Sequence, residues 1–325
     1  MMAVSEKCRR CASRRSVYPR LIGRARNHLR VRTCVIFNPA ARGNKARHFR
    51  RWLEGIGAAC TLMPTTVAGD ARRLAAEAVG TFSRIVAGGG DGTVNEVLNG
   101  IGDRPDGLAR TALGVLPLGT VNVFAKELKI PASLPAAWEI LQRGRELKMD
   151  LPRVEFSVHG KTARRYFVQL AGAGLDARAI ELVSWRLKKN AGPLAYVVAG
   201  LQALTERQPQ ITVRAGGQTL SGELVLIGNG KLYGGRFEVF PAADYTNGLL
   251  EACLFPRASL ATLLRCAPGF FLRKKLPEKV VRRLRAETME LTSETPTAFE
   301  LDGEWIGQLP ATFSIAPEKL RVVVP

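Results

Sequence analysis

The stretch from Arg84 to Gly100 limits what this chain can fold into more than any other part of the sequence. It begins with Ile85-Val86-Ala87, a short apolar run of the kind that forms a buried parallel strand. Apolar residues then recur at the spacing of one helix face, at Val94, Val97, Leu98 and Ile101. Between the two runs stand four glycines, Gly88, Gly89, Gly90 and Gly92. The pattern predicts a strand, a glycine-rich turn and a helix.

This turn has the residues of a phosphate-binding site. Glycines carry no Cβ and permit positive φ angles, so a ligand can approach the backbone and successive N–H groups can converge on phosphate oxygens. The positive end of the following helix points to the same place, where Thr93 adds a hydroxyl group. Asp91 would repel a phosphate, so a role through Mg²⁺ explains it better. The alternative interpretation is a tight turn that binds no ligand.

The turn is not a P-loop, because no Gly-Lys-Ser/Thr follows, and it lacks the Rossmann spacing of glycines. It resembles the Gly-Gly-Asp-Gly-Thr loop of the superfamily that contains diacylglycerol kinases, sphingosine kinases, NAD kinases and phosphofructokinases. The continuation through Asn95 and Glu96 is most similar to the lipid-kinase branch. The resemblance implies ATP as the phosphate donor with Mg²⁺ on the nucleotide, and it adds Asn95 and Glu96 to the nucleotide-binding residues.

Three other segments match family motifs on the nucleotide side. Asn38-Pro39 opens a segment that ends at Gly43, one residue later than in the family's Asn-Pro-x-x-Gly. Thr65 matches the first residue of Thr-x-x-x-Gly-Asp-Ala, whose acid, Asp70, also suits the start of a helix. Gly119-Thr120 matches the family's Leu-Pro-x-Gly-Thr. The resemblance implies that Asn38, Pro39, Gly43, Thr65, Gly119 and Thr120 contact the nucleotide.

The order of apolar runs predicts two domains after a basic tail. Residues 1–30 read as a disordered tail, and residues 31–148 alternate strands with helices, as in a three-layer α/β domain with a mostly parallel sheet. Residues 149–325 read as a β-rich, sandwich-like domain, with a strand at 165–170 and a helical stretch at 260–285. The last strand, 320–324, returns to the first domain in relatives. We expect a nucleotide-binding domain followed by a lipid-side domain.

The segment Leu301-Asp302-Gly303-Glu304 is the second chemical signal. An Asp-Gly step between two strand patterns is often only a hairpin turn. The segment also matches the family's Leu-Asp-Gly-Glu, in which the glutamate is the proposed base for the lipid hydroxyl. The resemblance therefore implies Glu304, Asp302 and Asp91 as catalytic residues, with Asp302 raising the pKa of Glu304.

A structural Mg²⁺ site of the family has changed in this chain. The family holds that ion through an aspartate side chain and two backbone carbonyls, and these positions correspond to Asn247, Asp244 and Leu249. An amide oxygen is a weaker ligand for Mg²⁺ than a carboxylate. Val123 replaces the second acid of the same network. We expect this metal site to be weak or empty while catalysis is retained.

The chain carries a net charge of +20, and residues 1–32 hold ten basic side chains against one acid. Such an excess favours an anionic partner, and without a nucleic-acid-binding signature a membrane surface is the better candidate. Apolar residues that accompany the basic stretches 186–189, 273–275 and 279–285 are Leu263, Leu264, Phe270 and Phe271. No apolar run is long enough to span a membrane, and six scattered cysteines fit a reducing compartment. The expectation is a cytoplasmic protein with peripheral membrane association.

The preferred function is an ATP-dependent kinase that phosphorylates diacylglycerol or a similar lipid. An NAD kinase is the alternative enzyme, and an inactive nucleotide- or lipid-binding regulator is the alternative that Val123 and Asn247 suggest. Nucleic acid is not an expected partner. The sequence leaves the lipid and the oligomeric state open, with a dimer as one option.

Overall fold

The computed structural model describes residues 31–325 except 40–45, 183–198 and 273–275. The expected tail, residues 1–30, therefore lies outside the described residues, as do Gly43 and two of the three basic stretches. Residues Val31–Pro325 cluster as one unit by their contacts.

The first half of the chain forms the parallel part of a large sheet. Its strands are β1 (Thr33–Phe37), β2 (Thr61–Pro64), β3 (Arg84–Gly89) and β4 (Ala112–Pro117). Their order is β2-β1-β3-β4, and every neighbouring pair is parallel. All residues of β3 and β4 are buried, as the continuous apolar runs predict for a parallel sheet covered on both faces.

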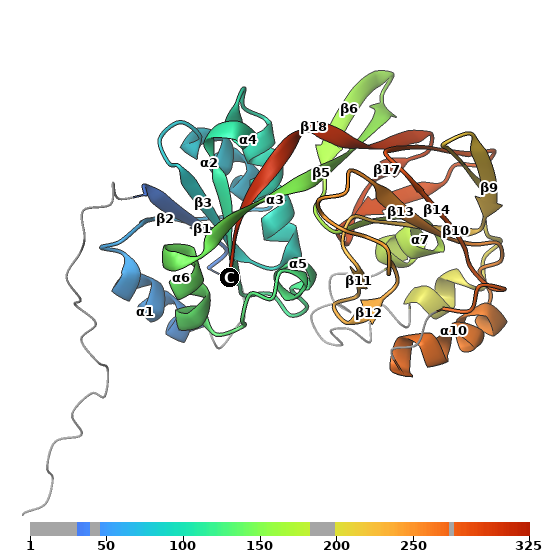
Figure 1. The fold of residues 1–325 in the computed structure, drawn as a ribbon, viewed down its shortest axis with the longest axis horizontal. Coiled ribbons are helices and arrows are strands. Elements are labelled where there is room, and N and C mark those ends of the chain that lie inside the picture. The colour runs from blue at the N-terminus through green and yellow to red at the C-terminus, as the bar shows by residue number, and fades with distance from the viewer. Residues whose placement is uncertain (1–30, 40–45, 183–198, 273–275) are drawn as a thin grey trace, which may run out of the picture. The chain divides into compact units, whose positions relative to one another are not determined.

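Helices cover both faces of this sheet (Figure 1). They are α1 (Ala46–Ile56), α2 (Asp70–Ala78), α3 (Asp91–Gly102), α4 (Gly107–Arg110), α5 (Val123–Glu127) and α6 (Leu134–Arg143). Trp52 of α1 packs edge-to-face on Trp138 of α6, with ring centroids 6.3 Å apart. Right-handed connections between parallel strands place α2 and α3 on the opposite face from α1. The expected three-layer α/β arrangement is confirmed.

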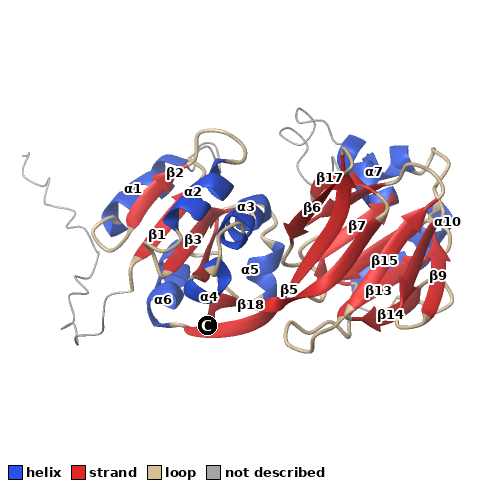
Figure 2. Ribbon diagram, turned by 90° about the horizontal axis from the view of Figure 1, so that it is seen from above, coloured by secondary structure: helices blue, strands red, loops and turns tan. Residues whose placement is uncertain are grey.

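Two long strands continue this sheet into the β-rich half. β5 (Arg145–Val158) spans the expected boundary at 148, and it pairs antiparallel with β18 (Ala311–Val324) along most of its length (Figure 2). The C-terminal end of β18 also lies parallel to β4, through Val322 and Leu113. The last strand therefore extends the nucleotide-side sheet. Farther along, the same sheet holds β6 (Lys161–Tyr166), β8 (Ile211–Ala215), β9 (Gln218–Gly222) and β15 (Thr288–Ser293).

A second, antiparallel sheet packs against this part and makes the predicted sandwich. Its described strands, in spatial order, are β14 (Arg282–Ala286), β13 (Leu250–Phe255), β10 (Leu224–Gly228), β7 (Leu170–Gly174), β16 (Ala298–Leu301) and β17 (Glu304–Gln308). The core between the sheets includes Phe156, Phe299 and Phe313, whose rings meet edge-to-face. This half of the chain also holds a two-stranded ribbon, β11 (Leu232–Tyr233) with β12 (Phe237–Glu238), the helices α7 (Leu175–Leu182) and α10 (Leu260–Leu272), and helical residues at 199–203.

Two expectations of secondary structure are wrong. The strand expected at 165–170 is divided, since β6 ends at Tyr166 and β7 begins at Leu170. The helix expected over 260–285 ends at Leu272, and residues from Arg282 form β14 because they pair with β13. Alternating side chains in β14 place Arg283 beside Glu251, so this basic stretch is not a helix face. None of the described helices is long and apolar enough to cross a membrane.

The position of β18 leads to a prediction of stability. Leu320 is fully buried and pairs with Met149 of β5, so Leu320→Ala should lower the free energy of unfolding by about 2–5 kcal/mol. Equilibrium unfolding in urea, followed by circular dichroism, measures this loss. Leu264→Ala on the exposed face of α10 is the control and should change stability by less than about 0.5 kcal/mol. Equal effects of the two substitutions would contradict the buried position of β18.

Candidate active site

A polar cleft of about 430 Å³ brings together segments from both halves of the chain. Its lining residues come from the end of β1, the loop after β2, the start of α3 and the start of β17. The predicted site residues among them are Asn38, Thr65, Gly90, Gly92, Thr93, Glu96 and Glu304. The carboxyl ends of parallel strands meet at one edge of a sheet, which explains why these nucleotide-side motifs converge.

The glycines of the central turn serve close packing. A Cβ at Gly119 would lie 2.5 Å from Cα of Gly90, so the two glycine-containing loops touch through their backbones. The N–H of Gly119 also donates to the carbonyl of Gly89 (3.3 Å). None of Gly88, Gly89, Gly90 and Gly92 has a positive φ, so this turn does not use the left-handed conformations that glycine permits. Gly88 and Gly89 are strand residues, and Gly90 is the extended residue before α3.

Glu304 lies against the glycine-rich turn. A Cβ at Gly92 would be only 2.6 Å from Oε1 of Glu304, so glycine at this position leaves room for the carboxylate. Glu304 begins β17 directly after a two-residue hairpin turn, in which Asp302 and Gly303 have φ angles of 50° and 89°. The segment is therefore a hairpin turn, as the alternative interpretation of its sequence predicts. It also brings Glu304 into the cleft.

Asp302 points away from the cleft and anchors the turn. Its oxygens accept hydrogen bonds from Nδ2 of Asn95 (2.8 Å) and from the N–H groups of Val168 (2.9 Å), Gln169 (2.9 Å) and Leu170 (3.2 Å). Burial raises the pKa of Asp302 above its ordinary value, although the four donors favour the charged form. Asn95 therefore supports the site indirectly, through its hydrogen bond to Asp302. The effect of Asp302 on the pKa of Glu304 stays a prediction.

Asp91 has a structural contact that the sequence did not reveal. Its carboxylate accepts hydrogen bonds from the N–H groups of Val123 (3.1 Å) and Phe124 (3.2 Å), which are the first residues of α5. A carboxylate at this end of a helix satisfies free N–H groups and interacts favourably with the helix dipole. Burial nevertheless raises the pKa of Asp91. Val123 therefore contributes a backbone N–H to this contact. It does so at a position where many members of the family have an acidic side chain.

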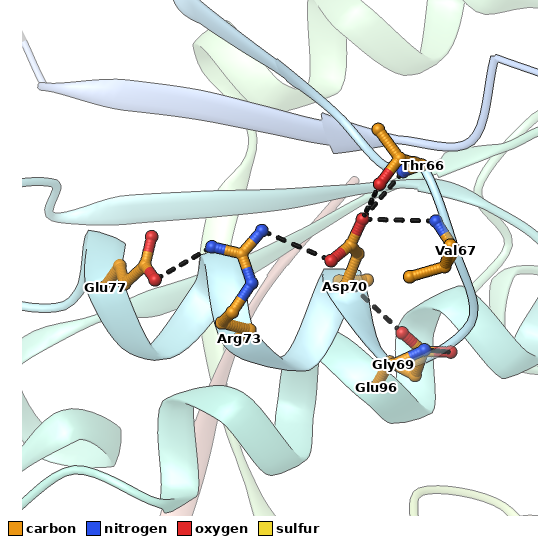
Figure 3. A network of polar contacts seen from close by, with 8 residues as sticks. Thr66, Val67, Gly69, Asp70, Arg73, Glu77 and Glu96 are labelled. Carbon is orange, nitrogen blue, oxygen red and sulfur yellow. Dashed lines mark hydrogen bonds and ion pairs between the residues drawn. The ribbon is translucent and has the colours of Figure 1, made fainter.

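Hydrogen bonds donated to two carboxylates shape the loop that carries Thr65 (Figure 3). Oδ2 of Asp70 accepts from the N–H (2.7 Å) and hydroxyl (2.5 Å) of Thr66 and from the N–H of Val67 (3.1 Å), and these bonds hold the pKa of Asp70 well below its usual range. Glu96 of α3 accepts from the N–H groups of Gly69 and Ala71 (3.1 and 3.0 Å). Glu96 therefore lines the cleft and also holds the start of α2.

Several predicted residues lie near the cleft without being part of its described lining. They are Pro39, Gly88, Gly89, Asp91, Asn95, Gly119 and Thr120. Gly119 contacts the cleft residue Gly90, and the N–H of Asn38 donates to the carbonyl of Gly88 (3.4 Å). Gly119 and Gly88 therefore support residues of the cleft wall.

The positions of the expected structural Mg²⁺ do not fit a tightly held cation. Oδ1 of Asn247 accepts the N–H of Leu249 (2.9 Å), and the backbone carbonyl of Asp244 accepts the N–H of Asn247 (3.4 Å), while the Asp244 carboxylate accepts the N–H and the hydroxyl of Thr246 (2.8 and 2.7 Å). Lys231 lines the same small pocket of about 210 Å³ as Asp244. An ammonium group beside this carboxylate opposes a second cation. Among the described residues, no group of three or more His, Cys, Asp and Glu side chains is placed to hold a metal ion.

Comparison with known proteins agrees with this arrangement. A diacylglycerol kinase catalytic domain matches residues 32–154, and a YegS C-terminal NAD kinase beta sandwich-like domain matches residues 169–324. Diacylglycerol kinases of Staphylococcus carnosus and Staphylococcus saprophyticus are 29% and 28% identical over 308 residues, which is 91% of this chain and 96% of each relative. The crystal structure of a diacylglycerol kinase from Bacillus anthracis superposes with a TM-score of 0.74 at 19% identity, covering 92% of this chain and 99% of that one.

The two domain matches follow each other in the order of the fold described above and together span both sheets. The structural likeness to the Bacillus anthracis protein concerns the fold alone. The sequence similarity to the two staphylococcal relatives extends over 91% of this chain. This chain therefore belongs to the diacylglycerol kinase family and is a kinase, a phosphotransferase with an alcohol group as acceptor.

Proposed function

We propose that this kinase transfers the γ-phosphate of ATP to the hydroxyl group of diacylglycerol or of a similar lipid. The observation that carries the proposal is the position of Glu304, whose carboxylate lies against Gly92 in a cleft lined by the nucleotide-side motifs. A carboxylate next to a phosphate-binding turn is the arrangement that phosphoryl transfer to an alcohol requires, because it can accept the proton of the hydroxyl group.

The nucleotide side of the cleft offers neutral donors and a helix end. The N-terminus of α3 begins at Asp91 and opens toward the cleft through Gly92 and Thr93. Backbone N–H groups and the positive end of a helix stabilise phosphate oxygens. Mg²⁺ would arrive with ATP, and it supplies neutralisation of the charge on the transferring phosphoryl group. Asp91 supports this region by holding the start of α5.

The acceptor is proposed to reach the cleft from an anionic membrane surface. Leu260 and Leu264, four residues apart on α10, are 54% and 64% exposed. The exposed Arg265 follows Leu264 directly, and the exposed Arg257 precedes Leu260 by three residues. An exposed apolar stripe with adjacent cations suits the interface of a bilayer. Each basic residue near an anionic leaflet adds about 1 kcal/mol of attraction. Peripheral association would bring a membrane-embedded hydroxyl to Glu304.

A transfer assay tests the proposal and separates it from its alternatives. The purified chain is incubated with Mg²⁺ and γ-labelled ATP together with vesicles that contain diacylglycerol, a ceramide or a long-chain base, or with NAD. We expect the label in a phosphorylated lipid, identified by mass, and none in NADP. Label in NADP alone would assign the chain as an NAD kinase, and no transfer to any acceptor would favour the inactive regulator.

Substitution of the candidate base is the second test. Glu304→Gln keeps the shape of the side chain but removes its ability to accept a proton, so kcat should fall by roughly 10²–10⁴-fold. The affinity for ATP should change by less than about twofold, because the amide keeps the volume and most hydrogen bonds of the carboxylate. Steady-state kinetics and nucleotide titration measure both quantities. A variant with normal kcat would refute the assignment of Glu304.

Asp302→Asn is the matched comparison for that variant. Its amide nitrogen would face backbone N–H donors in place of an acceptor, so a melting temperature below that of Glu304→Gln is expected. An Asp302→Asn variant with normal stability and a kcat as low as that of Glu304→Gln would show that Asp302 acts in the chemistry and not only as an anchor.

The changed metal positions yield a prediction of their own. The side-chain oxygen of Asn247 accepts the N–H of Leu249 and the backbone carbonyl of Asp244 accepts the N–H of Asn247, so a crystal grown in millimolar Mg²⁺ should show no octahedral ion there. Transfer should still require Mg²⁺ together with ATP, because that ion belongs to the nucleotide. An ordered octahedral ion coordinated by Asn247 in such a crystal would show the site to be retained.

A further inference from the structure

The hairpin turn before Glu304 is held from its buried side by a second glutamate. Oε2 of Glu300, in β16, accepts the N–H of Gly303 at 2.6 Å. Glu300 is 0% exposed, so this hydrogen bond is shielded from water. Gly303 directly precedes Glu304 in the chain. The side chain of Glu300 therefore fixes the peptide group from which the candidate base extends.

Glu300 is itself paired with another carboxyl group. Its Oε1 atom and Oδ2 of Asp176, at the start of α7, both lie beside Gly172, where a Cβ would come within 2.8 Å of Oε1. Both side-chain oxygens therefore approach the same point of β7. Oε1 has no hydrogen-bond partner among the described residues, and two ionised carboxylates side by side have no proton to offer it. One proton between Oδ2 and Oε1 satisfies both atoms.

The surroundings of the pair favour keeping that proton. Burial and the neighbouring charge of Asp176 raise the pKa of Glu300 well above its usual range, and burial also raises the pKa of Asp176. On the far side, the hydroxyl of Tyr233 donates to Oδ1 of Asp176 at 2.5 Å. Asp302 is the other ionisable group that acts on the pair, and its negative charge also favours the protonated state.

We propose that Glu300 and Asp176 are positioning residues that share one proton, and that the hydrogen-bonded chain from Tyr233 to Gly303 holds the turn carrying Glu304 in place. The inference rests on the proposed function, since it gives this chain the task of orienting the candidate base. Each link has a donor and an acceptor: the hydroxyl of Tyr233, the shared proton, and the N–H of Gly303. Neither Glu300 nor Asp176 is among the described residues that line the cleft.

The chemistry of the pair predicts which substitutions are tolerated. Glu300→Gln provides an amide oxygen for Gly303 and an amide N–H for Asp176, so it preserves the chain of hydrogen bonds without a shared proton. Glu300→Met keeps a similar volume but offers Gly303 no acceptor. A base displaced by a fraction of an ångström reacts much more slowly, even where binding is unchanged. Glu300→Gln should therefore retain the activity that Glu300→Met loses.

The test measures kcat, KM for ATP and melting temperature for the full chain carrying each substitution. Glu300→Met should lower kcat by about 10- to 100-fold with an unchanged KM for ATP. Glu300→Gln should keep kcat within about threefold of the unaltered enzyme. Rates are expressed per nucleotide-binding site counted by titration, so a smaller folded fraction does not imitate a slower reaction. Glu300→Ala replaces Glu300→Met and is judged by the same criteria if the latter binds no nucleotide.

Glu251→Met is the matched control. Glu251 in β13 is also a buried glutamate of the same sheet that accepts a backbone N–H, from Ala242 at 2.7 Å, but it is far from the turn in sequence and pairs with Arg283. Its substitution should lower the melting temperature and leave kcat per site unchanged.

Two results would overturn the inference: a kcat for Glu300→Met equal to that of Glu251→Met, or a Glu300→Gln variant as slow as Glu300→Met. Glu304→Gln, measured in parallel, separates this failure from that of the proposed function. Full turnover in Glu304→Gln refutes the proposed base. A loss of turnover in Glu304→Gln, combined with full turnover in Glu300→Met, refutes only the positioning role of Glu300.

Discussion

The carboxylate of Asp302 joins segments that are far apart in the sequence, and the candidate active site depends on it. One of its oxygens accepts from Asn95 in the helix that follows the glycine-rich turn, and both accept from the backbone of residues 168–170. Glu304 lies only two residues beyond Asp302. This one carboxylate therefore links the helix after the glycine-rich turn to the segment that carries the candidate base, and the low local dielectric strengthens each of its hydrogen bonds.

A second route connects the same helix to the same segment. Gln169 donates its N–H to Asp302 and its side-chain amide to Glu127 of α5 (3.1 Å). The start of α5 is held in turn by Asp91, the first residue of α3. The hydrogen bonds thus form a closed circuit through α3, α5 and residues 168–170, in which no member can shift alone. Val123 belongs to this circuit through its backbone N–H. The circuit therefore stays closed although position 123 has no acidic side chain.

The sequence predicted the parts of the site that depend on local pattern. Thr65, Thr93 and Glu304 meet in the cleft because the ends of parallel strands converge and the hairpin turn before Glu304 is encoded by adjacent residues. Contacts across long separations were missed, such as Asp91 with Phe124, 33 residues away, since no periodicity records them. The role of β14 was missed for the same reason, because a basic, mixed segment becomes a strand only by pairing with β13.

Three acids within five residues, Glu300, Asp302 and Glu304, have three different environments, and the environments decide what each can do. Glu300 faces another carboxyl group in a buried space, and burial together with that neighbouring charge raises its pKa well above its usual range. Asp302 faces four N–H donors, which stabilise its charge. Glu304 alone is exposed and reaches the cleft, so it can exchange a proton with a substrate. Chemically similar side chains thereby divide into a candidate base and two supports, and placing a carboxylate at any of these positions does not by itself make it catalytic.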